Sequence, residues 1–387
     1  MTSAGRILFY VQHLLGMGHL RRSVAIVRAA ARAGLDATLV TGGRVPDSLD
    51  VAGLDVVALP PLRAADENFK RLVDDDGRDI DDAYKEARRR LLHDTLARVR
   101  PQALVTELFP FGRRQLAFEL VPFVEAARAM QPRPLIVSSV RDVVEPPSKP
   151  ERLQEMMALA ERLFDVALVH GDPQLVRLED SFPTLGWLPA QLIYTGYVVE
   201  DPLVSPAAAG DGTGEVIVSA GGGRVGATLL HAAMDARPRT VLRDAPWRLL
   251  AGPLLPDESF AALRAAAPPG VAVERARRDF IALLHRARLS ISQGGYNTVC
   301  ETLAAGVPAV VVPFSGGRET EQRRRAELLA ARGAFEVVAA DALTPAALAA
   351  AADRAVAAPR RMAAVDLDGA AATARILAGL LAGRAAA

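Results

Sequence analysis

The sequence contains a single cysteine, Cys300, which excludes an intrachain disulfide and any zinc site built from several cysteines. It has only three lysines, so 43 of its 46 basic residues are arginines. The 45 acidic residues leave a net charge of +1, which gives no bulk field for attracting nucleic acid or anionic lipid. No apolar run reaches the roughly 18 residues that a membrane span needs. These absences favour a cytoplasmic protein.

The length of 387 residues predicts more than one domain, because a domain has about 150 residues. Short apolar runs alternate with helical stretches, which is typical of parallel sheets covered by helices. A segment rich in Pro, Gly, Ala and Ser, residues 201–214, interrupts the pattern, which restarts at Glu215. We therefore predict an α/β protein with two facing, doubly wound, Rossmann-like domains, residues 1–200 and 215–387, separated by a cleft.

Each predicted domain begins with a strand, a glycine-rich loop and a helix. The loops are Gly16-Met17-Gly18 and Gly221-Gly222-Gly223-Arg224-Val225-Gly226. Ligands of open parallel sheets bind at the carboxyl ends of the strands, where a helix N-terminus can hold a phosphate. Neither loop has the pattern of a Walker loop or of the usual dinucleotide fingerprint. A phosphate site and a simple strand-to-helix turn both remain open for these loops.

His19 directly follows the first loop, at the predicted start of a helix. A helix N-terminus disfavours the charged imidazolium, so a neutral histidine that can accept a proton is expected there. Such a group could serve as a general base. The alternative is a histidine that only caps the helix or packs at its entrance.

The most specific pattern lies between residues 289 and 314. A buried strand ends at Gly294-Gly295, a short helix begins near Asn297, and Glu301 follows one turn later. Gly306 ends this helix, and a second apolar strand then runs to Pro313. A carboxylate beside a glycine-lined helix start suits the two hydroxyl groups of a ribose. A surface glutamate favoured by the helix dipole is the alternative.

The pattern Gly-Gly-x-x-Thr-x-x-Glu at 294–301, then Ala-Gly-x-Pro at 305–308 and Glu321-Gln322, resembles the nucleotide-sugar signature of GT-B glycosyltransferases. It is closest in style to glycosyltransferase family 28, the peptidoglycan N-acetylglucosaminyltransferase group. The resemblance extends to both halves, since Gly-x-Gly-His at 16–19 matches the acceptor-domain loop of these enzymes and 221–226 their first C-terminal glycine loop.

The resemblance implies a role for each matching position. Glu301 would bind the donor ribose, and His19 would lie near the anomeric carbon. The other implied donor contacts are Gly294, Gly295, Thr298, Gly221, Gly222, Gly223 and Arg224 around the diphosphate, the segment Arg277 to Phe280 with Arg278 and Phe280 at the base, and Glu321 and Gln322 at the sugar. Cys300 stands where relatives often have serine, and residues 315–319 differ from the best-known enzymes, which leaves the sugar open.

Polar residues at other predicted strand ends of the first half are candidate acceptor contacts. They are Glu107, Arg113, Arg141 and Asp172, together with Gly16 and Gly18 of the first loop. Each could equally be structural, as polar residues at strand ends often are. We interpret Arg323-Arg324-Arg325 as a solvated helix face and assign no metal to Asp74-Asp75-Asp76, because a calcium loop needs further spaced ligands.

The resemblance implies an inverting glycosyltransferase that needs neither metal nor cofactor and moves a sugar from a nucleotide diphosphate, expected to be UDP, to a hydroxyl group. The acceptor is expected to be a small molecule or a lipid-linked one, with membrane contact at most peripheral. Gly16 to Arg22 also fits the Gly-x-Gly-His-x-x-Arg pattern of nucleotide-sugar hydrolases of sialic-acid-like pathways, in which water replaces the acceptor. An epimerase and a sugar-nucleotide-binding regulator are further alternatives.

Overall fold

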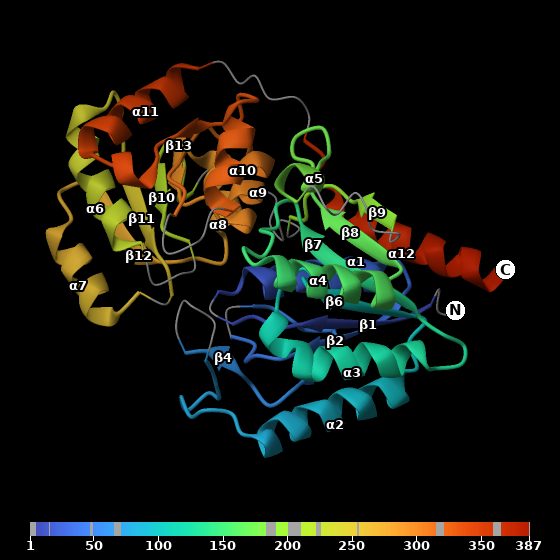
Figure 1. Cartoon of the computed structure of the whole chain (residues 1–387). Helices are drawn as coiled ribbons and strands as arrows, with labels where there is room; N and C mark the ends of the chain where they lie inside the picture. The colour runs from blue at the N-terminus through green and yellow to red at the C-terminus, as the bar shows by residue number, and fades with distance from the viewer. Residues whose placement is uncertain are drawn as a thin grey trace. The chain divides into compact units, whose positions relative to one another are not determined.

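The computed structural model describes residues 5–14, 16–46, 49–65, 71–182, 191–199, 210–221, 226–253, 255–314, 321–358 and 365–386. The chain forms two compact units, each with its own parallel sheet (Figure 1). Unit 1 contains residues 1–200 and 366–387, and unit 2 contains residues 201–365. The predicted α/β class with two Rossmann-like domains is therefore confirmed.

Unit 1 contains a seven-stranded sheet in the order β3-β2-β1-β6-β7-β8-β9. All its described strand pairs are parallel. The strands are β1 (Arg6–Val11), β2 (Asp36–Thr41), β3 (Asp55–Ala58), β6 (Ala103–Glu107), β7 (Leu135–Arg141), β8 (Val166–His170) and β9 (Gln191–Tyr194). A separate antiparallel pair, β4 (Arg63–Ala64) and β5 (Leu72–Val73), follows β3. The central strands are largely apolar and almost wholly buried, which is typical of parallel strands covered on both faces, and their polar residues gather towards their carboxyl ends.

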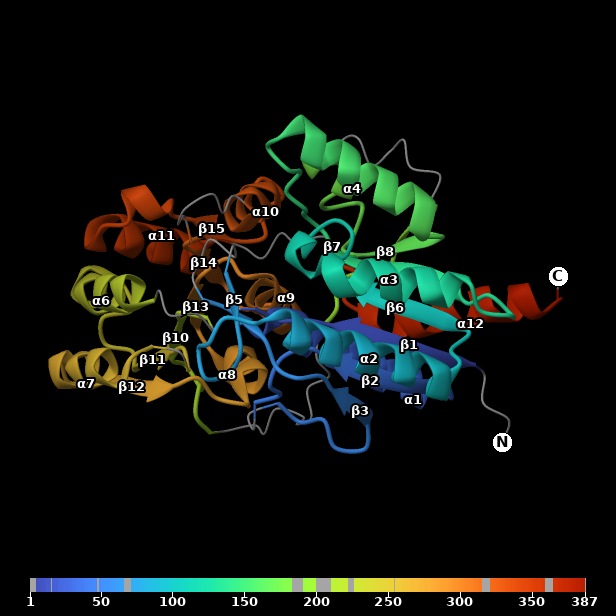
Figure 2. The ribbon, with the colours of Figure 1, turned by 60° about the horizontal axis from the view of Figure 1, so that its bottom comes forward.

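Two hydrophobic clusters cover the two faces of this sheet, and β1 contributes alternate residues to each. Ile7 and Phe9 pack with α1 (Gly18–Arg32) and α12 (Gly369–Ala386). Leu8 and Tyr10 pack on the other face with α2 (Asp82–Val99) and α3 (Ala117–Arg128), which lie side by side in Figure 2. The remaining helices are η1 (Arg114–Leu116), α4 (Pro150–Leu163) and α5 (Leu178–Ser181).

Unit 2 contains a six-stranded parallel sheet in the order β12-β11-β10-β13-β14-β15. Its strands are β10 (Val216–Ser219), β11 (Trp247–Ala251), β12 (Val271–Arg275), β13 (Leu289–Ser292), β14 (Ala309–Val311) and β15 (Glu336–Val337). α6 (Ala227–Ala236) and α11 (Pro345–Ala357) pack on one face. α8 (Phe280–Arg286) packs on the other face, next to α9 (Tyr296–Ala305). The other helices are η3 (Arg237–Arg239), α7 (Asp257–Ala266), α10 (Glu321–Ala330) and η4 (Ala340–Ala342).

The C-terminal helix corrects the predicted second domain of residues 215–387. α12 packs against α1, and its Ala374, Leu377 and Leu381 belong to the core of unit 1. The chain enters unit 1 again at Asp366, whose backbone N–H donates to Asp172 (3.1 Å). The Ala-rich pattern of the tail predicts a helix correctly, but its apolar face carries no information about which sheet it will cover.

The predicted linker, residues 201–214, is also corrected in its described part. Residues 210–214 belong to unit 2 and pack on α8. Gly212 has a φ of +92°, and a Cβ there would come within 2.8 Å of the Leu283 carbonyl oxygen. The composition of the segment predicts a flexible connection, whereas its glycine serves a close backbone contact.

Each sheet has a point where the strand order reverses. In unit 1 this point lies between β1 and β6, and in unit 2 it lies between β10 and β13. Loops that leave such neighbouring strands run in opposite directions and leave room for a ligand at the carboxyl edge of the sheet. Glu107 is the last residue of β6, whereas His19, Gly221 and Gly294 follow β1, β10 and β13.

Candidate functional site

His19 lies at the second residue of α1 and contacts the end of β6. Its Nδ1 is 2.6 Å from Oε1 of Glu107, the last residue of that strand. Glu107 is buried and His19 is half-buried, with 15% of its side chain exposed. An ionised Glu107 accepts a hydrogen bond from Nδ1–H, which leaves Nε2 of a neutral imidazole as the proton acceptor. The sequence pattern predicts a neutral histidine here but does not predict its partner.

Burial and neighbouring cations keep this histidine neutral. Desolvation, together with the positive charges of Arg113 and Arg141, lowers the pKa of His19 to about 3, although Glu107 acts in the opposite direction. The pKa of Glu107 is lowered to about 2 by His19, Arg22 and Arg113, which outweigh its own burial. At neutral pH the pair is therefore an imidazole and a carboxylate, the combination that a general base requires.

This charge state gives a prediction for pH dependence. His19 and the buried His170, whose pKa burial also lowers to about 3, should not titrate between pH 5 and 8. Both pKa values lie below the unfolded value of about 6.5, so between these values the unfolded state binds more protons than the folded state. The contribution of the two histidines to folding stability is therefore complete above pH 6.5 and falls as the pH drops towards 3. The loss is up to about 1.4 kcal/mol per pH unit for each histidine. NMR titration of ¹³C-labelled histidine, assigned with His19→Ala, checks this. A His19 midpoint near pH 6.5 would contradict it.

Two further groups, Arg22 and His170, lie near His19 and Glu107. Arg22, one turn further along α1, forms an ion pair with Oε1 of Glu107. His170 at the end of β8 lies 2.7 Å from the Ser139 hydroxyl and 2.9 Å from the Thr195 hydroxyl. The spacing of His19 and Arg22 by three residues places both on one helix face, which is the signal that could have identified Arg22.

The predicted acceptor residues differ in their positions and in what their side chains contact. Arg141 ends β7, the neighbour of β6, and Arg113 lies in the loop after β6. Asp172 is buried, and its two carboxylate oxygens accept the backbone N–H groups of Gln174 and Asp366, so it holds the returning chain. Gly16 is exposed and Gly18 is the first residue of α1.

The carboxyl edge of unit 2 brings two glycine turns together. Gly221 follows β10 with a φ of +68°, a conformation that favours glycine, and a Cβ there would lie 3.6 Å from Oε1 of Gln293. Gly295 precedes α9 with no side-chain cap, and the first turn of this helix has no acidic residue. The helix start therefore offers backbone N–H groups to an anion. Glu301, in its second turn, is buried.

The predicted sugar-contact residues begin α10 and pack against the Gly294 turn. The Gln322 side chain accepts the Phe314 N–H (3.2 Å), and its backbone lies 3.3 Å from a Cβ built on Gly294. Glu321 is paired with Arg325 (2.5 Å). Arg325 is fully buried, donates to the Gly294 carbonyl (3.4 Å) and stacks over Tyr296, so its interpretation as part of a solvated face is wrong. Because Arg325 stands in a run of three arginines, the sequence pattern does not show that its side chain is buried.

Of the other predicted donor residues, Thr298 lies half-buried in the first turn of α9, and its carbonyl accepts the Thr302 hydroxyl (2.7 Å). Phe280 is buried at the start of α8, and Arg278 is exposed two residues before it. Gly222, Gly223 and Arg224 lie outside the described residues.

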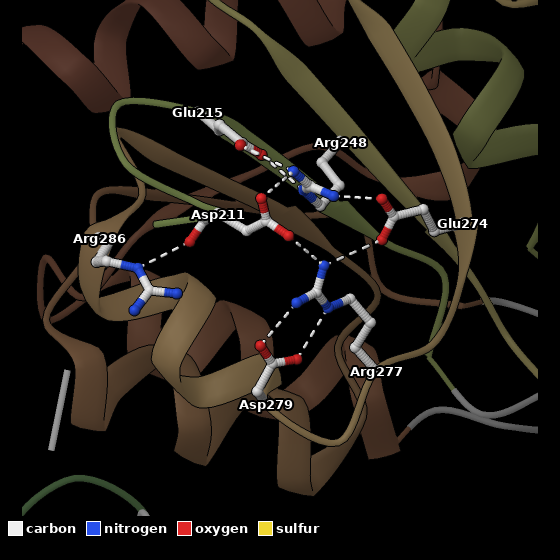
Figure 3. Close-up of polar contacts among 7 residues, drawn as sticks. All are labelled: Asp211, Glu215, Arg248, Glu274, Arg277, Asp279 and Arg286. Atoms are coloured by element: carbon white, nitrogen blue, oxygen red, sulfur yellow. Dashed lines mark hydrogen bonds and ion pairs between the residues drawn. The ribbon is translucent and has the colours of Figure 1, made fainter. Parts of the chain in front are cut away.

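An ion-pair network fixes the segment Arg277 to Phe280 (Figure 3). Arg277 binds Asp279 in a bidentate pair (2.9 and 2.8 Å) and reaches Asp211 (2.7 Å). Arg248 joins Glu215 (2.7 Å) to the same Asp211 (3.3 Å), and both arginines contact Glu274. The network ties residues 211–215 to the end of β12 and to Arg277 and Asp279 of the predicted base-binding segment.

Part of this chain matches the model of a known protein family. Residues 278–375, which include α9 and the start of α10, match the model of the glycosyltransferase family 28 C-terminal domain. The predicted resemblance to family 28 is confirmed. A curated relative is the UDP-N-acetylglucosamine–N-acetylmuramyl-(pentapeptide) pyrophosphoryl-undecaprenol N-acetylglucosamine transferase of Phenylobacterium zucineum, 30% identical over 183 residues. That match covers 44% of this chain and only half of the relative's length.

Solved structures resemble the whole chain. The calicheamicin glycosyltransferase CalG4 matches with a TM-score of 0.61 at 20% identity, over 99% of this chain and 95% of CalG4. The glycosyltransferase VinC in complex with DTDP matches with a TM-score of 0.60 at 16% identity, over 97% of this chain and 95% of VinC. At these identities the likeness shows the fold alone, and it confirms the predicted GT-B fold class.

The described residues contain no group of three or more His, Cys, Asp or Glu side chains that could hold a metal ion. In the same part of the chain, every helix is too short or too polar to cross a bilayer.

Proposed function

We propose that the protein transfers a sugar from a nucleotide diphosphate to a hydroxyl group of an acceptor, with inversion and without a metal ion. The observation that carries the proposal is the uncapped start of α9 after Gly294-Gly295, at the switch point of the unit 2 sheet and inside the family 28 match. Such a helix start suits the diphosphate of a donor.

In this proposal, unit 2 supplies the donor site. The N–H groups at the start of α9, near Thr298, bind the diphosphate together with the loop that begins at Gly221. Glu301 binds the ribose, and the segment held by Arg277 borders the base. Because helix dipole and N–H groups stabilise the charge that develops on the leaving diphosphate, the reaction needs no metal.

Unit 1 supplies the base. Nε2 of His19 takes the proton of the acceptor hydroxyl as the oxygen attacks the anomeric carbon, opposite the leaving diphosphate. Glu107 holds Nδ1–H and stabilises the imidazolium that forms. The lowered pKa of His19 keeps it unprotonated before the reaction, and Arg22 keeps Glu107 in place.

The relatives favour transfer over hydrolysis. The curated relative is named for transfer to a pyrophosphoryl-undecaprenol acceptor, and the hydrolase alternative gains no support from the proteins described above. We propose a nucleotide sugar and a small-molecule or lipid-linked hydroxyl compound as substrates, and a cytoplasmic location. The DTDP bound to VinC and the UDP-sugar of the curated relative leave both nucleotides as candidates for this chain.

Calorimetry with UDP and dTDP, each alone and as its glucose and N-acetylglucosamine conjugates, tests the donor site. One of these is expected to bind without metal, and Glu301→Gln should weaken it about tenfold or more, since it removes an ionic hydrogen bond worth about 1.5–3 kcal/mol. The matched control is Glu327→Gln, on the exposed face of α10. Equal binding by wild type and Glu301→Gln would contradict the ribose role, and no binding of any nucleotide would contradict the donor site.

A further inference from the structure

Arg113 is a largely buried cation whose guanidinium forms no direct ion pair with another described residue. It follows β6 in the left-handed conformation, with φ 60° and ψ 29°, at the N-cap of η1. Among the described residues its guanidinium has no hydrogen-bond or ion-pair partner, and its Nε is fully buried. A buried donor left unpaired costs about 1–3 kcal/mol, so such a group calls for an explanation.

The neighbouring Arg114 shows how differently an ordinary surface arginine behaves here. Arg114 is exposed, and its Nε lies 3.1 Å from Oε2 of Glu155 on α4. Arg113 is also an arginine, one residue earlier, but its Nε is buried, and its charge lies close enough to His19 and Glu107 to lower their pKa values.

The surroundings of Arg113 are rich in positive charge. Burial lowers its pKa, and the charges of Arg141 and Arg22 lower it further, while Glu107 acts in the opposite direction. Oε1 of Glu107 is already shared by His19 and Arg22. Arg113 therefore feels the charges of two further guanidinium groups, and the nearby carboxylate already has one oxygen engaged.

Glu107 has a second, unused oxygen. Its Oε2 is buried and has no hydrogen-bond partner among the described residues. The same small region of unit 1 thus holds an unpaired cation, an unpaired carboxylate oxygen and a proton-accepting imidazole. In a molecule that carries an anionic group and a hydroxyl group, the anionic group would pair with Arg113 and the hydroxyl group would donate to Nε2 of His19.

We propose that Arg113, supported by Arg141, binds an anionic group, phosphate or carboxylate, of the acceptor. The planar guanidinium fork matches the two oxygens of either group and is the usual partner for both. The hydroxyl group of the same molecule lies towards Nε2 of His19. The identity of the bound molecule as acceptor rests on the proposed function, whereas the anion site is a property of unit 1 alone.

Calorimetric titration of the full chain with pyrophosphate and with malonate tests the site. Before the titration, the protein is saturated with the nucleoside diphosphate that the donor screen identifies, or with UDP. This ligand occupies any site in unit 2 that could otherwise bind pyrophosphate or malonate. We expect binding of at least one probe to the wild type and a Kd raised at least tenfold in Arg113→Met. Arg113→Lys, which keeps the charge but loses the fork, should be intermediate, and Arg114→Met should bind as the wild type does.

Vesicles distinguish a lipid from a soluble source of the anion. Co-sedimentation compares phosphatidylcholine vesicles with vesicles that also contain phosphatidic acid. Arg113-dependent binding to the acidic vesicles alone assigns a lipid-borne group, and Arg113-dependent binding of the free probes assigns a soluble one; both support the site. Unchanged binding in both Arg113 variants, or no binding of any probe, overturns it. The results with the Arg113 variants do not affect the donor measurements with Glu301→Gln. The anion site and the donor site can therefore be disproved independently of each other.

Discussion

Replacing His19 by alanine is expected to reduce kcat by about 10²–10⁴, the range that a positioned general base contributes. The Nδ1 contact with Glu107 fixes the ring, and the low pKa keeps Nε2 free of a proton, so truncation removes the base without a substitute. Donor affinity should stay within about twofold, because the donor is proposed to bind to unit 2. The measurement is initial-rate kinetics with the acceptor, combined with calorimetry for the donor.

His93→Ala is the matched control for this prediction, since His93 lies exposed on α2. It should retain wild-type kcat. Retention of kcat within a few-fold by His19→Ala, with donor binding intact, would exclude His19 as the base.

Replacing Arg88 by methionine is expected to lower the free energy of unfolding by about 3–5 kcal/mol, the usual cost of removing one partner of a buried ion pair. Arg88 of α2 is fully buried and binds both carboxylate oxygens of Glu119 on α3 (2.7 Å each). It also donates to the Gly42 carbonyl (3.0 Å) and to Gln12 (3.1 Å), just after β2 and β1. The Tyr10 hydroxyl donates to the same Glu119 (2.6 Å).

Chemical denaturation monitored by circular dichroism measures this effect. Arg90→Met, on the exposed face of α2, should change the free energy of unfolding by less than about 0.5 kcal/mol. The double variant Arg88→Met, Glu119→Leu should recover much of the loss, because it leaves no unpaired buried charge. A loss below about 1 kcal/mol in Arg88→Met would show that the buried pair contributes little.

The sequence predicts the strands and the end of α9 well because these features are local. Buried parallel strands are short apolar runs, and Gly306 ends α9 in the left-handed conformation that glycine favours, with a φ of 59°. The alternation of strands and helices predicts parallel sheets, and His19 and Gly294 follow strands at their carboxyl ends as the pattern predicts, whereas the strand order and the switch points come from the structure.

The pairings between distant residues could not be predicted in the same way. Glu107 meets His19 only because β6 lies next to β1, a contact that spans 88 positions in sequence. Arg325 lies in a run of charged residues whose composition predicts exposure, yet it is buried against Tyr296. The return of α12 to unit 1 depends on which sheet has an uncovered face, and local propensity does not contain that information.

The most direct test of the central claim is the fate of an isotope-labelled nucleotide sugar in the presence of EDTA and an acceptor hydroxyl compound. Mass spectrometry and NMR follow the label and the anomeric configuration. The account predicts a new glycoside with inverted configuration, formed at an undiminished rate without metal and lost in His19→Ala. Release of free sugar alone, retention of configuration, or a requirement for added metal would contradict it.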